Sequence, residues 1–169
     1  REMVRLRDVL EIDTDNRFIR VQTGVTNLSV SAELEPYGFF YAPDPSSQLA
    51  CTIAGNIAMN SGGAHCLKYG VTTNNLLGVT MVLMDGSIVE LGGPMGEGPG
   101  LDLLGVVCGA EGQLGVVTEA TLRILPRPEG ARARRCVAER PVPPLTPVPG
   151  ATPADRPART RVQLHLPTR

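Results

Sequence analysis

The sequence contains few aromatic residues and almost no lysine. It has no tryptophan and only three phenylalanines and three tyrosines in 169 residues. Its single lysine, Lys68, is also the only basic residue between Val21 and Leu122. That long stretch therefore has no row of positive charge that could neutralise a nucleic-acid backbone. We do not expect nucleic acid as a ligand.

Long apolar runs are also missing. The longest, such as Val79–Met84, end well short of the roughly 18 apolar residues that a membrane helix needs, so we predict no transmembrane segment. The first residues lack the apolar stretch of a secretory signal. We expect a cytoplasmic protein, with a peripheral position at the inner face of a membrane, in a complex, as the alternative. A hydrophobic content of 42% is enough for one domain with its own core.

Charge and proline divide the chain into two parts. Residues 1–130 carry eight basic and fifteen acidic side chains, a net charge of −7, whereas residues 131–169 carry eight arginines against two acidic residues, a net charge of +6. The second part also holds eight of the fifteen prolines and no aromatic residue. We predict a folded domain over 1–130. For 131–169 we predict a low-complexity tail that is either disordered or read out of frame.

Apolar and turn patterns predict short elements in residues 1–130. Alternation over Leu6–Ile12 and Arg17–Thr23 indicates a hairpin. Thr26 begins a short helix that Pro36 ends, before a strand at residues 39–41. Further elements are expected as a helix over Ile53–Asn60, a hairpin of Leu76–Met84 and Ser87–Leu91 joined by a type I′ turn at Asp85-Gly86, a helix over Leu101–Cys108, and a β-rich stretch over Val116–Leu125.

The residue types give little support for metal or hydrolytic chemistry. Cys51, Cys66, Cys108 and Cys136 are widely spaced and favour small buried thiols over a disulfide framework. His65-Cys66 lacks the further ligands of a zinc site, so we predict no metal. The dinucleotide and phosphate-binding glycine motifs and the hydrolase motifs are absent. No residue stands out as a catalytic base, and we name none.

Two glycine-rich stretches are the strongest candidates for a binding site. They span Pro43–Gly70 and Gly109–Thr118. Glycines allow a backbone to approach a ligand closely, and successive N–H groups at a turn suit an anion. The same glycines also suit ordinary turns between short strands. The residues alone leave both interpretations open.

Three segments carry a resemblance to a known family: PDPSSQLACTIAGNIAMNSGGAHCLKYGVTTNNLLG, MDGSIVELGG and GLDLLGVVCGAEGQLGVVTEATLRILPRP. Over residues 3 to 128 the chain resembles the FAD-linked oxidases with a PCMH-type (vanillyl-alcohol-oxidase-like) flavin domain, and within them the glycolate oxidase and D-lactate dehydrogenase branch. The resemblance implies an α+β fold, as part of a PCMH-type FAD-binding domain with a mixed sheet and short flanking helices.

The resemblance also implies FAD as the cofactor and a set of residues near it. His65 is expected to be a local structural residue, with a covalent flavin link as the alternative. Ala54 stands where the family often has glycine. The expected FAD-binding residues are Pro43, Ser46, Ser47, Cys51, Ile53, Ala54, Gly55, Asn56, Ala58, Asn60, Gly62, Gly63, Tyr69, Gly70, Glu111, Gly112, Gly115, Val116, Val117 and Thr118.

The function implied by the resemblance is oxidation of a small 2-hydroxy acid, glycolate or D-lactate, by hydride transfer to FAD. An iron–sulfur subunit is an expected electron acceptor, beside a quinone or cytochrome. The family's upstream pyrophosphate loop and its substrate-binding cap have no counterpart in the sequence, so we expect a fragment that is inactive alone. The alternatives are a non-catalytic remnant and the flavin domain of another PCMH-type oxidase, such as a sugar-alcohol oxidase.

Overall fold

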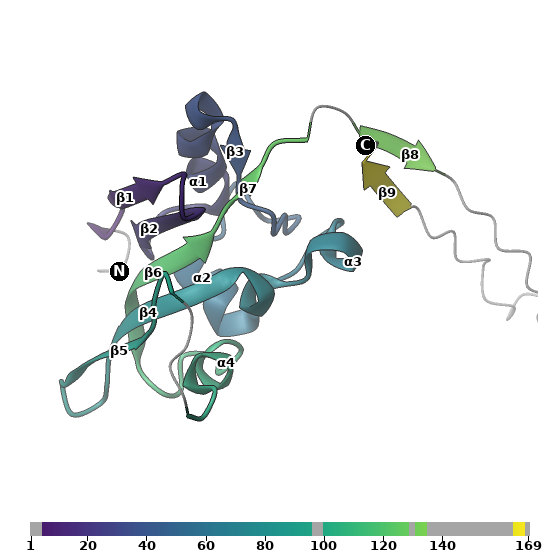
Figure 1. The fold of residues 1–169 in the computed structure, drawn as a ribbon. Helices are drawn as coiled ribbons and strands as arrows, with labels where there is room; N and C mark the ends of the chain where they lie inside the picture. The colour runs from purple at the N-terminus through teal and green to yellow at the C-terminus, as the bar shows by residue number, and fades with distance from the viewer. Residues whose placement is uncertain (1–4, 96–99, 129–130, 135–163, 168–169) are drawn as a thin grey trace, which may run out of the picture. The chain divides into compact units, whose positions relative to one another are not determined.

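A computed structural model of the chain describes residues 5–95, 100–128, 131–134 and 164–167. The chain forms two compact units, Arg1–Arg127 and Pro128–Arg169, and we treat each by itself. The first unit contains a five-stranded sheet, four short α-helices and two 3₁₀ turns among its described residues (Figure 1).

The sheet has the strand order β1-β2-β6-β4-β5. Every neighbouring pair in it is antiparallel. The α+β class and the PCMH-like fold are confirmed, but the mixed sheet that we expected is a wholly antiparallel one among the described strands. Two pairs are hairpins, which must be antiparallel, and β6 enters between them (Figure 1). The five strands are β1 (Val9–Asp13), β2 (Phe18–Gln22), β4 (Leu76–Val82), β5 (Ile88–Gly92) and β6 (Val116–Arg123).

The first two α-helices each begin at a threonine whose side chain caps the helix. Thr26 accepts a hydrogen bond from the Ser29 N–H at the start of α1 (Asn27–Leu34), and Thr52 accepts one from the Gly55 N–H at the start of α2 (Ile53–Met59). The remaining elements of this unit are η2 (Glu35–Tyr37), β3 (Phe39–Phe40), α3 (Cys66–Tyr69), η3 (Thr72–Asn75), α4 (Leu103–Val107) and β7 (Leu125–Pro126), of which β3 and β7 pair with each other. The predicted positions of the helices over 27–34, 53–59 and 103–107 are confirmed.

The connection between β4 and β5 differs from the predicted type I′ turn. That turn needs positive φ at both central residues, but only Gly86, at φ +84°, has it, and Asp85 does not. The Gly86 N–H donates to the Leu83 carbonyl, and the Leu83 N–H donates to the Ser87 carbonyl. The hairpin is where the sequence predicts it, but its turn is a three-residue loop with one left-handed glycine.

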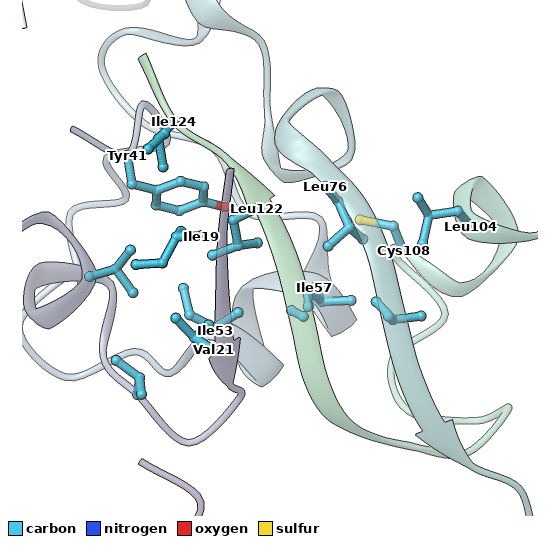
Figure 2. Packing of buried hydrophobic residues seen from close by; sticks show 14 of the residues in the cluster. Ile19, Val21, Tyr41, Ile53, Ile57, Leu76, Leu104, Cys108, Leu122 and Ile124 are labelled. Carbon is cyan, nitrogen blue, oxygen red and sulfur yellow. The ribbon is translucent and has the colours of Figure 1, made fainter. Parts of the chain in front are cut away.

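The core lies between the sheet and the helices. Ile19 and Val21 of β2, Leu122 of β6 and Ile53 and Ile57 of α2 are all at most 1% exposed and belong to one cluster (Figure 2). Because Ile53 and Ile57 are four residues apart on α2, they fix one face of that helix against the sheet. The position of α2 is therefore set by the core.

The second unit contains one antiparallel pair of short strands, β8 (Ala131–Arg134) and β9 (Leu164–Pro167). The rest of the predicted tail lies outside the described residues, so the disordered or out-of-frame tail and the boundary at residue 130 stay predictions. In the part of the chain that the structure describes, no helix is long and apolar enough to cross a membrane. The cytoplasmic location also stays a prediction.

Candidate functional site

The two glycine-rich stretches meet at the end of α2. The Gly109 N–H donates to the Ile57 carbonyl at 2.8 Å, and the Glu111 N–H donates to the Ala58 carbonyl at 2.9 Å. Carbonyls in the last turn of a helix lack the usual N–H donor four residues further on. Here the second glycine-rich stretch supplies two donors. Segments about fifty residues apart in sequence are thereby joined through their backbones.

An apolar pocket of about 220 Å³ lies beside this junction; we call it the α2 pocket. Six of the predicted FAD-binding residues line it: Ala54, Ala58, Gly112, Gly115, Val116 and Val117. Five further lining residues were not predicted: Ile57, Met81, Val107, Ala110 and Leu114. The helical spacing from Ala54 indicates Ile57, and Ala110 and Leu114 lie inside the second glycine-rich stretch. Met81 and Val107 carry no sequence signal that separates them from other core residues.

Small residues keep the α2 pocket open. Ala54 and Ala58 lie one turn apart on α2, so both contribute only a methyl group to its wall. Gly112 has φ +76°, and a Cβ built there meets no atom within 4 Å. Gly115 is different, because a Cβ there would lie 2.5 Å from the Val82 carbonyl oxygen. Gly112 therefore borders open space, whereas Gly115 is needed for the approach to β4.

The start of α2 has its N–H groups already bonded. Ile53 donates to the Val25 carbonyl, Ala54 to the Thr23 carbonyl and Gly55 to the Thr52 hydroxyl. These are the donors that commonly hold a phosphate at a helix N-terminus. An anionic group near residues 51–56 would therefore have to be held by other atoms.

Other predicted residues form bonds inside the protein. In the buried interior Asn56 Nδ2 donates to Asn27 Oδ1, and Asn27 Nδ2 donates to the Pro43 carbonyl, both at 2.9 Å. Asn60 has φ +47° and ends α2, and its Oδ1 accepts the Thr73 N–H at 3.0 Å. The side chains of Asn56 and Asn60 thus have hydrogen-bond partners within the protein itself.

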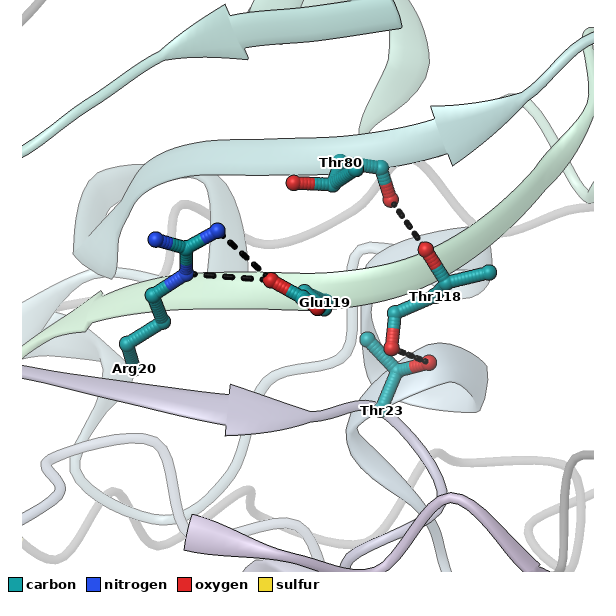
Figure 3. Close-up of polar contacts among 5 residues, drawn as sticks. All are labelled: Arg20, Thr23, Thr80, Thr118 and Glu119. Carbon is teal, nitrogen blue, oxygen red and sulfur yellow. Dashed lines mark hydrogen bonds and ion pairs between the residues drawn. The ribbon is translucent and has the colours of Figure 1, made fainter. Parts of the chain in front are cut away.

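Thr118 is also committed to neighbouring strands. Its hydroxyl donates to the Thr80 carbonyl at 3.1 Å, and its carbonyl accepts the Thr23 hydroxyl at 3.3 Å (Figure 3). The same carbonyl also accepts the Thr23 N–H at 3.0 Å. The Thr23 hydroxyl donates to the Val117 carbonyl at 2.6 Å. On the same sheet Arg20 forms an ion pair with Glu119 at 2.7 Å (Figure 3). Thr23, which was not predicted, thus contacts both α2, through its carbonyl, and the start of β6.

The remaining predicted residues do not line the α2 pocket. Pro43, Ser46 and Ser47 precede α2, and Gly62, Gly63, Tyr69 and Gly70 follow it; we call residues 43–47 and 61–70 the loop pair. All three of these glycines avoid collisions within the protein: a Cβ at Gly62 would lie 2.5 Å from Cys66 Sγ, one at Gly63 would overlap the Asp44 carbonyl, and one at Gly70 would overlap the Asn74 side chain. The Tyr69 ring packs edge-on against Phe40, at a centroid separation of 5.7 Å. Of the others, Ile53 belongs to the core, Cys51 is half-buried, and Gly55 and Glu111 are exposed.

Electrostatics at the α2 pocket are those of an apolar site. No charged or hydrogen-bonding side chain is among its described lining residues. Burial raises the pKa of the Cys108 thiol, which neighbours Asn60 Oδ1 at 3.6 Å. Burial also raises the pKa of the Tyr41 hydroxyl in the adjoining core. Both groups stay neutral near pH 7, so the pocket can hold an uncharged group but supplies no acid or base.

Comparison with known protein families gives a match over most of the first unit. The family model described as "FAD binding domain" matches residues 2–92. The chain is 49% identical over 130 residues to "Glycolate oxidase subunit GlcD" of Escherichia coli (strain K12), covering 77% of this chain and 26% of that protein. It is 36% identical over 128 residues to "D-lactate dehydrogenase" of Anaerostipes hadrus, covering 75% of this chain and 27% of that protein.

Among solved structures, alkyldihydroxyacetonephosphate synthase matches with a TM-score of 0.68 and 26% sequence identity, over 76% of this chain and 23% of that one. The chain thus spans about a quarter of the length of the curated relatives that it matches. The same fold occurs in proteins whose names denote different reactions, so the fold alone does not select the reaction.

Proposed function

This chain belongs to the FAD binding domain family, and from that premise we propose that it forms the flavin-holding part of an enzyme that oxidises a small 2-hydroxy acid. The observation that carries the proposal is the junction of α2 with residues 109–117 around one apolar pocket. Both walls come from segments that the sequence predicts to bind FAD.

FAD is the cofactor of this family, and when bound it supplies a flavin that accepts a hydride from the substrate carbon. The α2 pocket suits an uncharged ring, because its walls are methyl groups, glycine backbone and branched aliphatic side chains. Its volume of about 220 Å³ is smaller than the roughly 300–1,000 Å³ of typical complete ligand sites. We infer that Ala54, Ala58, Gly112, Val116 and Val117 contact one ring system of FAD.

The rest of the cofactor is assigned to the loop pair. The diphosphate carries negative charge, and the α2 pocket has no cationic side chain to face it. The N–H groups at the start of α2 are already bonded, whereas the loop pair carries seven of the predicted FAD-binding residues and Lys68, the one lysine of the chain. The chain's role is therefore to bind and orient the cofactor and to exclude water from its ring.

The substrate proposal is supported by the names of relatives. One is named a glycolate oxidase subunit and another a D-lactate dehydrogenase, and both names denote enzymes of small 2-hydroxy acids. We extend this substrate class to the complete protein and, because one relative is named a subunit, we propose an iron–sulfur partner as its electron acceptor. The α2 pocket has no side chain that could take the hydroxyl proton, so that base lies outside it.

Two experiments test this proposal. In the first, the purified chain is titrated with FAD, FMN and riboflavin while flavin fluorescence is recorded. We expect saturable binding of FAD, and no dye reduction with glycolate or D-lactate by the chain alone. In the second, residues 5–128 replace the matching segment of the E. coli glycolate oxidase subunit, to which the chain is 49% identical. We expect the chimera to retain flavin and to oxidise glycolate.

The outcomes separate the alternatives. A folded chain and a folded chimera that both hold no FAD would contradict the proposal and favour a non-catalytic remnant. If the chimera holds flavin, its rates of oxidation of glycolate, D-lactate and a sugar alcohol should be measured and compared with those of the unmodified E. coli subunit. Equal substrate preference in both is expected if this segment acts on the flavin and leaves substrate choice to other parts of the enzyme.

A further inference from the structure

We propose that Asp44 and His65 are positioning residues, whose pairing fixes the two halves of the loop pair at the spacing that FAD requires. This inference rests on the proposed function, because it assigns the loop pair a role in holding FAD. It concerns two residues that the sequence did not place in the FAD-binding set.

Asp44 contacts His65 through both of its carboxylate oxygens. Oδ2 lies 2.5 Å from Nδ1 of the imidazole, and Oδ1 accepts the backbone N–H of His65 at 3.2 Å. The two side chains are 25% and 42% exposed. A carboxylate that bonds both the side chain and the backbone of one residue fixes the orientation and the position of that residue together.

A close backbone approach reinforces the pair. A Cβ at Gly63 would overlap the Asp44 carbonyl, so the two backbones touch two residues before His65. Only glycine allows this approach. The halves of the loop pair are therefore in contact at two points: the backbone of Gly63 lies against the Asp44 carbonyl, and His65 bonds the Asp44 carboxylate.

The same loop is tied to α2 on its other side. The Pro43 carbonyl accepts from Asn27, whose side chain in turn accepts from Asn56 of α2. A continuous series of contacts thus leads from α2, which lines the pocket, through Pro43 and Asp44 to His65. A shift of His65 would change the placement of residues 61–70 relative to the pocket wall.

The pair contributes little to the core. No residue between Ala58 and Asn75 belongs to the hydrophobic cluster, so residues 61–70 are held by polar contacts and by the packing of Tyr69 against Phe40. Both partners are partly exposed, where an ion pair adds little to global stability. Loss of the pair should therefore loosen the loop far more than it destabilises the protein.

The test compares four variants of the 169-residue chain with the unsubstituted chain. His65→Ala removes the imidazole, and Asp44→Ala removes both bonds. His65→Asn restores a donor, because the Asn amide nitrogen occupies the place of Nδ1. Leu49→Ala is the matched control, since Leu49 is 77% exposed and lies outside the loop pair. For each, amide hydrogen exchange of residues 61–70, the melting temperature without flavin, and the dissociation constant of FAD are measured.

We expect His65→Ala to speed exchange in residues 61–70 and to weaken FAD binding by roughly three- to tenfold. The melting temperature should change little. Asp44→Ala should have the larger effect, His65→Asn should restore most of both losses, and Leu49→Ala should match the unsubstituted chain. Unchanged FAD affinity in a folded His65→Ala variant, or no rescue by His65→Asn, would overturn the positioning role alone. If the unsubstituted chain binds no FAD, the affinities are measured on the same variants of the chimera. If the chimera binds none either, the proposed function fails and the positioning role fails with it, whatever the exchange rates.

Discussion

The backbone N–H of Glu111 donates to the carbonyl oxygen of Ala58 at 2.9 Å. Glu111 adopts a left-handed conformation, φ +53°, and Gly112 follows at φ +76°. The chain thereby turns sharply beside α2 and continues into β6. One backbone bond thus joins the helix and the glycine-rich loop whose residues form opposite walls of the α2 pocket.

The buried Asn27 side chain provides the first prediction. It bonds Asn56 on one side and the Pro43 carbonyl on the other, and it is 1% exposed. Replacing Asn27 with Ala leaves both partners buried without a bond, which costs about 1–3 kcal/mol. Urea unfolding should show this loss of unfolding free energy, while Gln113→Ala at an exposed position should not. Equal stability of the two variants would contradict the buried network.

Gly55 and Gly62 lie in the same glycine-rich stretch, but replacing them with alanine should change the stability of the chain in opposite directions. At Gly62 a Cβ would lie 2.5 Å from Cys66 Sγ and 2.9 Å from Val71 Cγ1, whereas at Gly55 the nearest atom is Thr52 Oγ1 at 3.6 Å. We expect Gly62→Ala to destabilise the chain by about 1–3 kcal/mol, and Gly55→Ala, inside α2, to stabilise it by about 0.5–1 kcal/mol. Thermal unfolding of both variants checks the signs.

A bulky substitution at Gly62 is a poor test of flavin binding. From the sequence, such a substitution is expected to remove flavin by occupying its space. In the structure the new side chain meets Cys66 and Val71 first, so flavin loss would follow from disturbed packing as well. Ala58, which lines the α2 pocket directly, is the better position for that experiment.

Cysteine reactivity provides a prediction about pH. Burial raises the pKa of Cys108, so at any pH below that pKa a smaller fraction is thiolate than for an ordinary cysteine. Alkylation of the folded chain at pH 8 should label the half-buried Cys51 and Cys66 before Cys108. The labelling rate of Cys108 should begin to rise at a higher pH than that of an ordinary cysteine. Peptide mass mapping gives the order. Labelling of Cys108 first would contradict its placement beside Asn60.

Much of the fold follows from local signals in the sequence. Thr26 caps its helix as the sequence predicts, and the Asp85-Gly86 pair correctly locates a hairpin, whereas Thr52, the cap of α2, was not singled out. The turn type was wrong because a dipeptide does not determine whether the loop has two or three residues. The position of β6 between β2 and β4 depends on long-range pairing, which no local pattern reports.

The sequence indicates which segments form the candidate site, but not which of their residues lie side by side, because that also depends on long-range contacts. Glycines and alanines mark where a backbone approaches something closely, but they do not say what. Gly112 and Gly115 both line the α2 pocket, but Gly115 also lies against Val82, and Gly63 lies against Asp44. Asn56, one of the predicted FAD-binding residues, bonds Asn27 across 29 residues of sequence, a contact that no local pattern indicates. The pairing of Asp44 with His65 spans 21 residues of sequence, so only the folded chain brings these two side chains together.

The central claim is that the α2 pocket receives a ring of FAD, and a pair of adjacent substitutions on α2 tests it most directly. Ala58 lines the pocket, whereas Met59 is 64% exposed and does not. Ala58→Phe and Met59→Phe add a similar ring at neighbouring helix positions, and only the first fills the pocket. The dissociation constant of FAD is measured by flavin fluorescence for both variants and the unsubstituted chain, with circular dichroism to confirm folding. We predict that Ala58→Phe weakens FAD binding at least about tenfold, which corresponds to about 1.4 kcal/mol, and that Met59→Phe leaves it unchanged. A folded Ala58→Phe variant that binds FAD as tightly as the unsubstituted chain would contradict the account.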